Sequence, residues 1–140
     1  MQKTDPPSVT GTIQLGTQSI RLIATHPMPP MGKSLCDRRN QQLIALGNLI
    51  ATVNDPVLLI GDLNTSSYSA HFKILLEKSK LKDSRLGFGI QPTWPVGLSF
   101  FSIPLDHVLL SNDLHVLERT TGEDIGSDHL PVNITIGTSQ

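Results

Sequence analysis

The apolar run Val57-Leu58-Leu59-Ile60, followed at once by Gly61-Asp62-Leu63-Asn64, constrains the fold of this chain more than any other segment. Such a short, fully apolar run is typical of a strand that is buried on both faces. The preceding residues 34–53 predict an amphipathic helix, because apolar residues recur there at helical spacing. A helix leading into a buried strand indicates a sheet covered by helices. Ligands of such sheets gather beyond the carboxyl ends of the strands, where Asp62 and Asn64 fall.

Alternation, turn residues and caps predict the remaining elements. These are an antiparallel hairpin (8–15 and 18–25), a short strand (57–60), a second helix (69–79) and three further strands (105–111, 114–120 and 130–136). Residues 82–104 are rich in Gly, Pro and Ser and predict a long loop, and loops of this length are often functional. The sum is one α/β (α+β) domain over residues 1–140, with a mixed or antiparallel sheet and two helices packed on one face.

Composition limits the classes of function. The net charge of −1 carries no signature of strong, sequence-independent nucleic-acid binding. Lys3, Lys33, Arg38 and Arg39 are candidates for a local basic patch, although a solvated surface is the commoner explanation. The single Cys36 excludes an intrachain disulfide, and no stretch approaches the ~20 apolar residues of a membrane span.

Two polar pairs and a lone aspartate form a candidate catalytic set. Asp62 and Asn64 are spaced by two, so both side chains can face one cleft; alternatively they form a turn or cap a helix. In the pair Asp128-His129, the imidazole can accept a proton from water or stabilise a phosphoryl oxygen, whereas the bland alternative is a turn aspartate beside a surface histidine. Asp106 can orient His129 through one imidazole nitrogen, which requires the strands carrying them to be neighbours.

Histidine and aromatic residues complete the candidates. His26 opens the stiff segment His26-Pro27-Met28-Pro29-Pro30 and can donate a proton to a leaving oxygen, or simply pack against prolines. Trp94 and Phe100-Phe101 can form an aromatic wall for a base or lipid chain, although core packing is the more common role. His107 faces away from Asp106 and is expected to be structural.

Four segments occur in an informative order: Thr25-His26, Gly61-Asp62-Leu63-Asn64, Asp106-His107-Val108-Leu109 and Gly126-Ser127-Asp128-His129-Leu130-Pro131. This order resembles the endonuclease/exonuclease/phosphatase (DNase-I-like) family, in an uncharacterised bacterial branch. The resemblance implies that His26 contacts the scissile phosphate or leaving group, that Asn64 binds the phosphate and that Asp106 orients the catalytic His129. It further implies Mg²⁺ or Mn²⁺, with Asp62 positioning the attacking water or the metal and Asp128 linked to metal binding.

The resemblance covers roughly the second half of the family domain, a four-layer sandwich of two sheets. The family places an Asn and a metal-binding Glu earlier than any of these four segments, and residues 1–20 contain no Glu. The resemblance therefore implies weak metal binding by this chain alone and an exposed sheet face that favours a homodimer. Members of this branch are often predicted to carry N-terminal membrane segments, so a longer parent is expected to be anchored.

The sequence thus predicts a metal-dependent phosphoesterase of nuclease or phosphatase type in the full-length parent. Nucleic acid, phospholipid and inositol phosphate remain open as substrates, with Asn64 and Trp94 as substrate contacts. The alternative is a non-catalytic interaction module or structural fragment of the same fold. A calcineurin-like metallophosphoesterase is a weaker interpretation, because Gly61-Asp62 alone suggests it and its Gly-Asn-His-Glu segment is absent.

Overall fold

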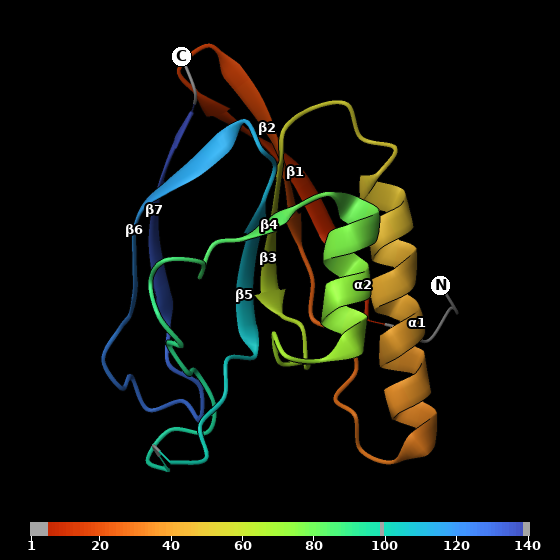
Figure 1. Cartoon of the computed structure of the whole chain (residues 1–140), viewed down its shortest axis with the longest axis vertical. Helices are drawn as coiled ribbons and strands as arrows, with labels where there is room; N and C mark the ends of the chain where they lie inside the picture. The colour runs from red at the N-terminus through yellow and green to blue at the C-terminus, as the bar shows by residue number, and fades with distance from the viewer. Residues whose placement is uncertain (1–5, 99, 139–140) are drawn as a thin grey trace.

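The main sheet has five strands in the order β1-β2-β3-β5-β4 (Figure 1). The computed structural model describes residues 6–98 and 100–138. The strands are β1 (Val9–Leu15), β2 (Gln18–Ala24), β3 (Val57–Asp62), β4 (Lys82–Asp83) and β5 (Asp106–Leu110). β1 and β2 form the predicted antiparallel hairpin, β2 and β3 run parallel, and β5 is antiparallel to β3. The sheet is therefore mixed, which confirms the predicted class.

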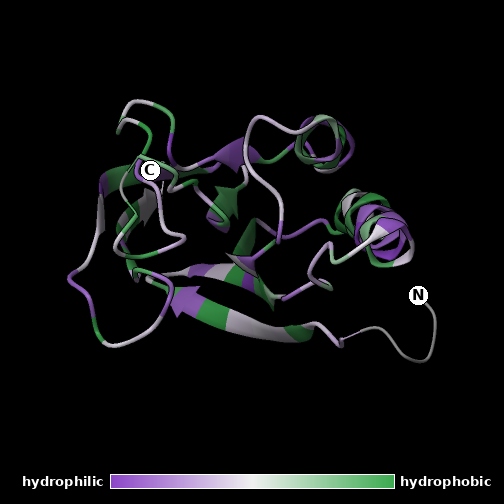
Figure 2. Cartoon of the chain, turned by 90° about the horizontal axis from the view of Figure 1, so that it is seen from below, coloured by the Kyte–Doolittle hydropathy of each residue, from purple (hydrophilic) through white to green (hydrophobic). Residues whose placement is uncertain are grey.

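Both predicted helices are present and cover one face of this sheet. α1 (Lys33–Ile50) connects the parallel strands β2 and β3, and α2 (Ala70–Ser79) packs beside it (Figures 1 and 2). α2 begins after Ser69, whose hydroxyl oxygen accepts a hydrogen bond from the backbone N–H of Phe72 at 3.1 Å. Neither of these helices is long and apolar enough to cross a membrane.

β3 is buried on both faces, as its sequence predicts. Val57 and Leu59 belong to the core cluster beneath the helices, whereas Leu58 and Ile60 contact the cluster on the opposite face. Successive side chains of a strand point to opposite sides, so this short apolar run packs into the core clusters on both faces of the sheet. This double burial fixes the position of Asp62 at the strand's last residue.

The last two strands form a sheet of their own, which corrects the prediction of one continuous sheet. β6 (Leu114–Thr121) and β7 (Val132–Thr138) pair only with each other among the strands of the described residues. Their half-buried apolar side chains pack on the main sheet opposite the helices. The alternating pattern of β7 is thus satisfied by face-to-face packing rather than by an edge of the main sheet.

The predicted loop over residues 82–104 is mostly irregular but firmly attached. Its first residues form β4, and Trp94 and Ile103 form an isolated antiparallel bridge further along. The buried Arg119 donates through Nε to the hydroxyl of Ser84 at 3.0 Å and through its guanidinium to the side chain of Gln91. These bonds tie the loop to β6, and the loop then continues to the end of the sheet at which β3 ends (Figure 1).

Candidate active site

A pocket of about 920 Å³ opens at the end of the sheet where β2 and β3 finish and β5 begins. It receives side chains from loops that are far apart in the sequence, among them the segment after β2 and the segment before β7. Every residue singled out from the sequence as catalytic, metal-binding or substrate-binding lines it: His26, Asp62, Asn64, Trp94, Asp106, Asp128 and His129.

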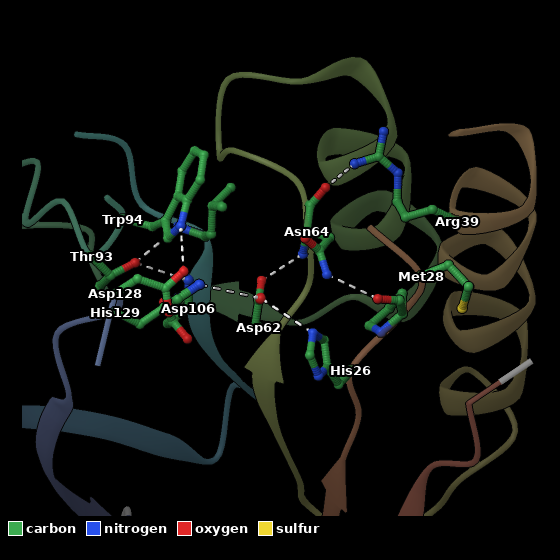
Figure 3. Close-up of polar contacts among 12 residues, drawn as sticks. His26, Met28, Arg39, Asp62, Asn64, Thr93, Trp94, Asp106, Asp128 and His129 are labelled. Atoms are coloured by element: carbon green, nitrogen blue, oxygen red, sulfur yellow. Dashed lines mark hydrogen bonds and ion pairs between the residues drawn. The ribbon is translucent and has the colours of Figure 1, made fainter. Parts of the chain in front are cut away.

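Two imidazoles and two carboxylates form a continuous line across this pocket (Figure 3). Nδ1 of His129 lies 2.8 Å from Oδ2 of Asp106, and Nε2 of the same ring lies 3.9 Å from Oδ2 of Asp62. Nε2 of His26 lies 3.3 Å from the same Asp62 oxygen. His26 is mostly exposed, whereas the other three side chains are largely shielded from solvent. The arrangement can hold a water between acidic and basic groups.

Gly61 explains why His26 and Asp62 meet. A Cβ at position 61 would lie 1.8 Å from the carbonyl oxygen of Thr25, and the residue has φ +145°. Only glycine permits this approach of the two parallel strands without strain. The N–H of Thr25 also donates to the carbonyl of Ile60 at 3.0 Å. His26, just after β2, and Asp62, at the end of β3, are therefore held side by side.

Asn64 lies beyond the end of β3 and makes a turn, so its placement differs from the strand-like spacing predicted for it. Its backbone N–H donates to Oδ1 of Asp62 at 2.8 Å, and its φ is +48°. Its side-chain amide donates to the carbonyl of Pro27 at 3.0 Å. Asn64 thus both lines the pocket and forms the turn that the alternative interpretation named.

The contact between Asp106 and His129 forms although β5 and β7 are not neighbours, so the predicted condition for it is wrong. Thr93 replaces strand pairing as the link. Its buried hydroxyl oxygen accepts hydrogen bonds from the backbone N–H groups of Leu105 (3.1 Å) and Asp106 (3.2 Å). Its carbonyl accepts from the N–H of Leu130 at 2.8 Å. One residue thereby fixes the backbone on both sides of the Asp106–His129 pair.

Burial and neighbouring charge shift two pKa values in the site. Burial raises the pKa of Asp62 above its ordinary 3.8 and the charge of Asp106 adds to this, although the Asn64 N–H and both histidines oppose it. Burial lowers the pKa of His129, but the hydrogen bond to Asp106 and the surrounding carboxylates outweigh burial and leave the pKa above 6.5. Both groups are therefore stronger bases than in water.

The aromatic residues are not in the core, which corrects the expectation for them. Trp94 is 36% exposed at the pocket wall, its ring centroid 6.3 Å from that of His129, and its Nε1 donates to Oδ2 of Asp128 at 3.2 Å. Phe100 and Phe101 are exposed to solvent. By contrast, His107 is buried against Phe72 with Nε2 2.8 Å from the Thr65 carbonyl oxygen, in the structural role predicted for it.

The carboxylates of the pocket do not by themselves make a complete cation site. Among residues 6–98 and 100–138, no group of three or more His, Cys, Asp or Glu side chains is arranged to hold a metal ion. Asp62 is occupied by two imidazoles and Asp128 by the Trp94 indole. Waters and substrate oxygens supply several of the roughly six ligands of a hard cation, but a protein site still needs carboxylates that are free to face the ion.

Arg39 is a pocket residue that the sequence reasoning assigned to solvated surface. It is 8% exposed, and its guanidinium donates to the carbonyl of Asn64 and to Oδ1 of Asn40. The sequence did indicate that Arg39 faces inward, because it falls on the apolar stripe of its helix, four residues before Leu43. Lys33 is exposed, Arg38 is half-buried, and Lys3 lies outside the described residues.

Comparisons with known proteins show the family and the fold of this chain. The family model described as "Endonuclease/Exonuclease/phosphatase family" matches residues 2–129. No curated protein matches the sequence.

Three solved structures resemble the chain. An endonuclease/exonuclease/phosphatase from Beutenbergia cavernae DSM 12333 has a TM-score of 0.73 at 19% identity, covering 95% of this chain and 39% of its own. Humanized D. rerio TDP2 has a TM-score of 0.70 at 16% identity, and the match covers 92% of this chain and 59% of that structure. The Bacteroides thetaiotaomicron VPI-5482 mannosyl-6-phosphatase Bt3783 has a TM-score of 0.55 at 19% identity, and the match covers 86% of this chain and 51% of that structure.

At these identities the likeness shows the fold, and this chain spans between 39% and 59% of the length of those structures. The family model, in contrast, matches most of the chain and includes every one of the site residues from His26 to His129. This protein belongs to the endonuclease/exonuclease/phosphatase family.

Proposed function

We propose that a protein containing this chain and the rest of its domain hydrolyses a phosphomonoester or phosphodiester. The observation that carries the proposal is the line Asp106–His129–Asp62–His26 across one pocket, with contacts of 2.8, 3.9 and 3.3 Å. Membership of a family that includes phosphatases and nucleases is consistent with this class of reaction.

Each side chain has a distinct task in the proposed reaction. Asp106 accepts a hydrogen bond from the Nδ1–H of His129, which keeps the proton on Nδ1 and leaves Nε2 unprotonated and directed toward Asp62. A water beside Asp62 Oδ2 attacks phosphorus while His129 Nε2 accepts its proton, the bond between phosphorus and the ester oxygen breaks, and the leaving alcohol takes a proton from His26 or from solvent. His26, which is exposed at the mouth of the pocket, donates a hydrogen bond to a phosphoryl or leaving oxygen. Asn64 and Trp94 flank the phosphate ester as substrate contacts.

A divalent cation, Mg²⁺ or Mn²⁺, is part of the proposal, with Asp62 and Asp128 as its ligands in this chain. Such an ion would neutralise charge on the phosphoryl oxygens. Since no three His, Cys, Asp or Glu side chains of the described residues converge on one point, the proposal includes a further ligand from elsewhere in the domain. We expect Mg²⁺ to raise the Tm of this chain little, and to raise the Tm of a protein with the complete domain clearly.

Substitution of the two central residues tests the assignment. In a protein with the complete domain, His129→Ala and Asp62→Ala should each lower kcat/KM for bis-nitrophenyl phosphate by about 10²–10⁴-fold. His115→Ala is the matched control, because His115 is an exposed histidine on β6 away from the pocket. Wild-type turnover in either site variant would refute the roles of His129 and Asp62 in the reaction.

A non-catalytic interaction module is the second candidate, and the exposed face of β1 favours it. Val9, Ile13 and Leu15 are 69%, 39% and 36% exposed and lie on the face that Ile20 shares with the β6–β7 cluster. A second copy of the chain would cover this apolar face. Concentration-dependent dimerisation by sedimentation, with neither Mg²⁺ binding nor turnover, would support this candidate instead.

A further inference from the structure

Two polar side chains interrupt the apolar face that α1 turns toward the core. Arg39 and Gln42 are each 8% exposed, and a separation of three residues places them on the same face of the helix. Leu43 and Leu46, which continue this face, belong to the core cluster beneath the helices. A buried polar group destabilises the fold unless it is hydrogen-bonded, so the partners of these two side chains indicate what they do.

Gln42 holds one peptide unit in the segment that follows His26. Its Oε1 accepts a hydrogen bond from the N–H of Met28 at 3.2 Å. The carbonyl of the same peptide unit, which belongs to Pro27, accepts one from Nδ2 of Asn64 at 3.0 Å. A carbonyl oxygen can only accept, so Nδ2 rather than Oδ1 of Asn64 must face Pro27. Gln42 thereby acts on the orientation of the Asn64 carboxamide through a single peptide unit.

Arg39 holds the main chain of the same asparagine. Its guanidinium donates to the carbonyl of Asn64 (Figure 3). Asn64 has a φ of +48°, a left-handed conformation that persists where surrounding contacts hold it. The N–H of Asn64 donates to Asp62, so this turn is held on both sides. Two further N–H groups of the guanidinium donate to Oδ1 of Asn40 at 2.8 Å and to Sγ of Cys36 at 3.6 Å, both on α1. The guanidinium thus joins the helix to the turn.

We infer that Arg39 and Gln42 are positioning residues of the proposed reaction: from one face of α1 they fix the Asn64 carboxamide at the wall of the pocket. The inference rests on the proposed function, in which Asn64 contacts the phosphate ester. A side chain that is already oriented loses less freedom when substrate binds, and small displacements of such groups slow catalysis strongly. All these contacts join buried or half-buried residues of this chain, so they do not depend on what covers the mouth of the pocket.

Removal of the Asn64 side chain tests whether the two residues act through it. Asn64→Gly keeps the carbonyl that Arg39 binds and tolerates the left-handed turn, but it removes the carboxamide. In a protein with the complete domain, Arg39→Met and Gln42→Leu should each lower kcat/KM for bis-nitrophenyl phosphate by about 10–100-fold. In the Asn64→Gly background, the same substitutions should lower it by less than about threefold. Arg39→Lys keeps the charge but not the fork of donors, and it gives the same test should Arg39→Met fail to fold.

Amide hydrogen exchange tests Arg39 without any turnover. Exchange of the Asn64 N–H requires its bond to Asp62 to open, and Arg39 holds the turn that makes this bond. In the present chain, Arg39→Met should therefore speed exchange of this N–H about 10–100-fold, the factor expected for loss of one hydrogen bond from a charged donor. Gln42→Leu should move the NMR signals of the Asn64 side-chain amide, because its Pro27 acceptor is no longer fixed.

Arg21→Met and Gln41→Leu are the matched controls. Arg21 pairs with Asp55 beside the first residue of β3, at the other end of that strand from Asp62. Gln41 is exposed and precedes Gln42 on α1. Both variants should keep the kcat/KM of the wild type and its rate of exchange at the Asn64 N–H.

The inference fails if Arg39→Met or Gln42→Leu lowers kcat/KM by the same factor in the presence and in the absence of the Asn64 carboxamide, because both would then act on the fold as a whole. It also fails if a control variant loses as much activity, or if exchange of the Asn64 N–H is unchanged in Arg39→Met. A wild-type complete domain without turnover, together with faster exchange in Arg39→Met, would instead overturn the proposed function and support the hold of Arg39 on Asn64.

Discussion

Replacing Thr93 by valine separates the contribution of its hydroxyl group to the stability of the fold from the contribution of its methyl group. The Thr93 side chain is 1% exposed, and its hydroxyl oxygen is the acceptor for two backbone N–H groups, those of Leu105 and Asp106. Valine keeps the branched shape of threonine but offers no acceptor. Both N–H groups would then face an apolar methyl in a site closed to water.

The expected loss of stability follows from the two hydrogen bonds that the Thr93 hydroxyl no longer accepts. A buried donor left without a partner costs about 1–3 kcal/mol, the full value applying to the buried Leu105 N–H and a smaller one to the half-buried Asp106 N–H. We therefore expect Thr93→Val to lower the free energy of unfolding by about 2–4 kcal/mol. Thr93→Ser keeps the hydroxyl and loses one methyl, so it should cost only about 1 kcal/mol.

Urea denaturation followed by far-UV circular dichroism measures both variants on one scale. The valine variant should be less stable than the serine variant by at least about 1 kcal/mol at an unchanged slope with urea. If serine is instead the worse substitution, packing of the methyl group dominates. The account of Thr93 as the polar link between Asp106 and Leu130 would then be wrong.

Three further predictions concern the strand end, the helix cap and the proton balance of the site. Gly61→Ala should destabilise the fold by about 3 kcal/mol or more in urea, because the new methyl would meet the Thr25 carbonyl; a loss below about 1 kcal/mol would contradict the close approach. Ser69→Ala should cost about 1 kcal/mol through loss of the α2 N-cap, and Ser69→Asn should restore most of it in the same assay. Asp106→Asn should lower the pKa of His129 measured by NMR titration and move the acid limb of the pH–rate profile of the complete domain to lower pH. Because the folded pKa of His129 is raised, its stabilising contribution is fully present below pH 6.5 and is lost as the pH rises through the folded value; Asp106→Asn should remove that pH dependence, and an unchanged dependence would reject the dyad.

The elements with strong local patterns were predictable from the sequence. The hairpin, both helices and the strand β3 follow from alternation, helical spacing and caps, which depend on nearby residues. That these polar residues line one pocket was predictable, because the ends of β2, β3 and the loop before β7 each carry polar residues in an order that resembles one family. That resemblance, rather than spacing alone, brought His26 and His129 into the same prediction.

Features that depend on tertiary packing were not predictable in this way. Whether β6 and β7 extend the main sheet or face it depends on which apolar faces meet, and alternation along β7 is the same in both cases. Thr93 looks like any loop threonine until its two backbone partners, distant by 12 and 13 residues, are known. Phe100 and Phe101 were expected in the core because hydrophobicity alone does not report exposure.

Because Gly61 has no side chain, the backbone rather than a choice of rotamer sets how closely the His26 and Asp62 side chains approach each other. The spacing between the His26 imidazole and the Asp62 carboxylate is inherited from how closely β2 approaches β3, and few substitutions can adjust it. Substitutions in the proline-rich segment after His26 and in the loop that carries Trp94 would instead reshape the walls of the pocket and leave this spacing unchanged.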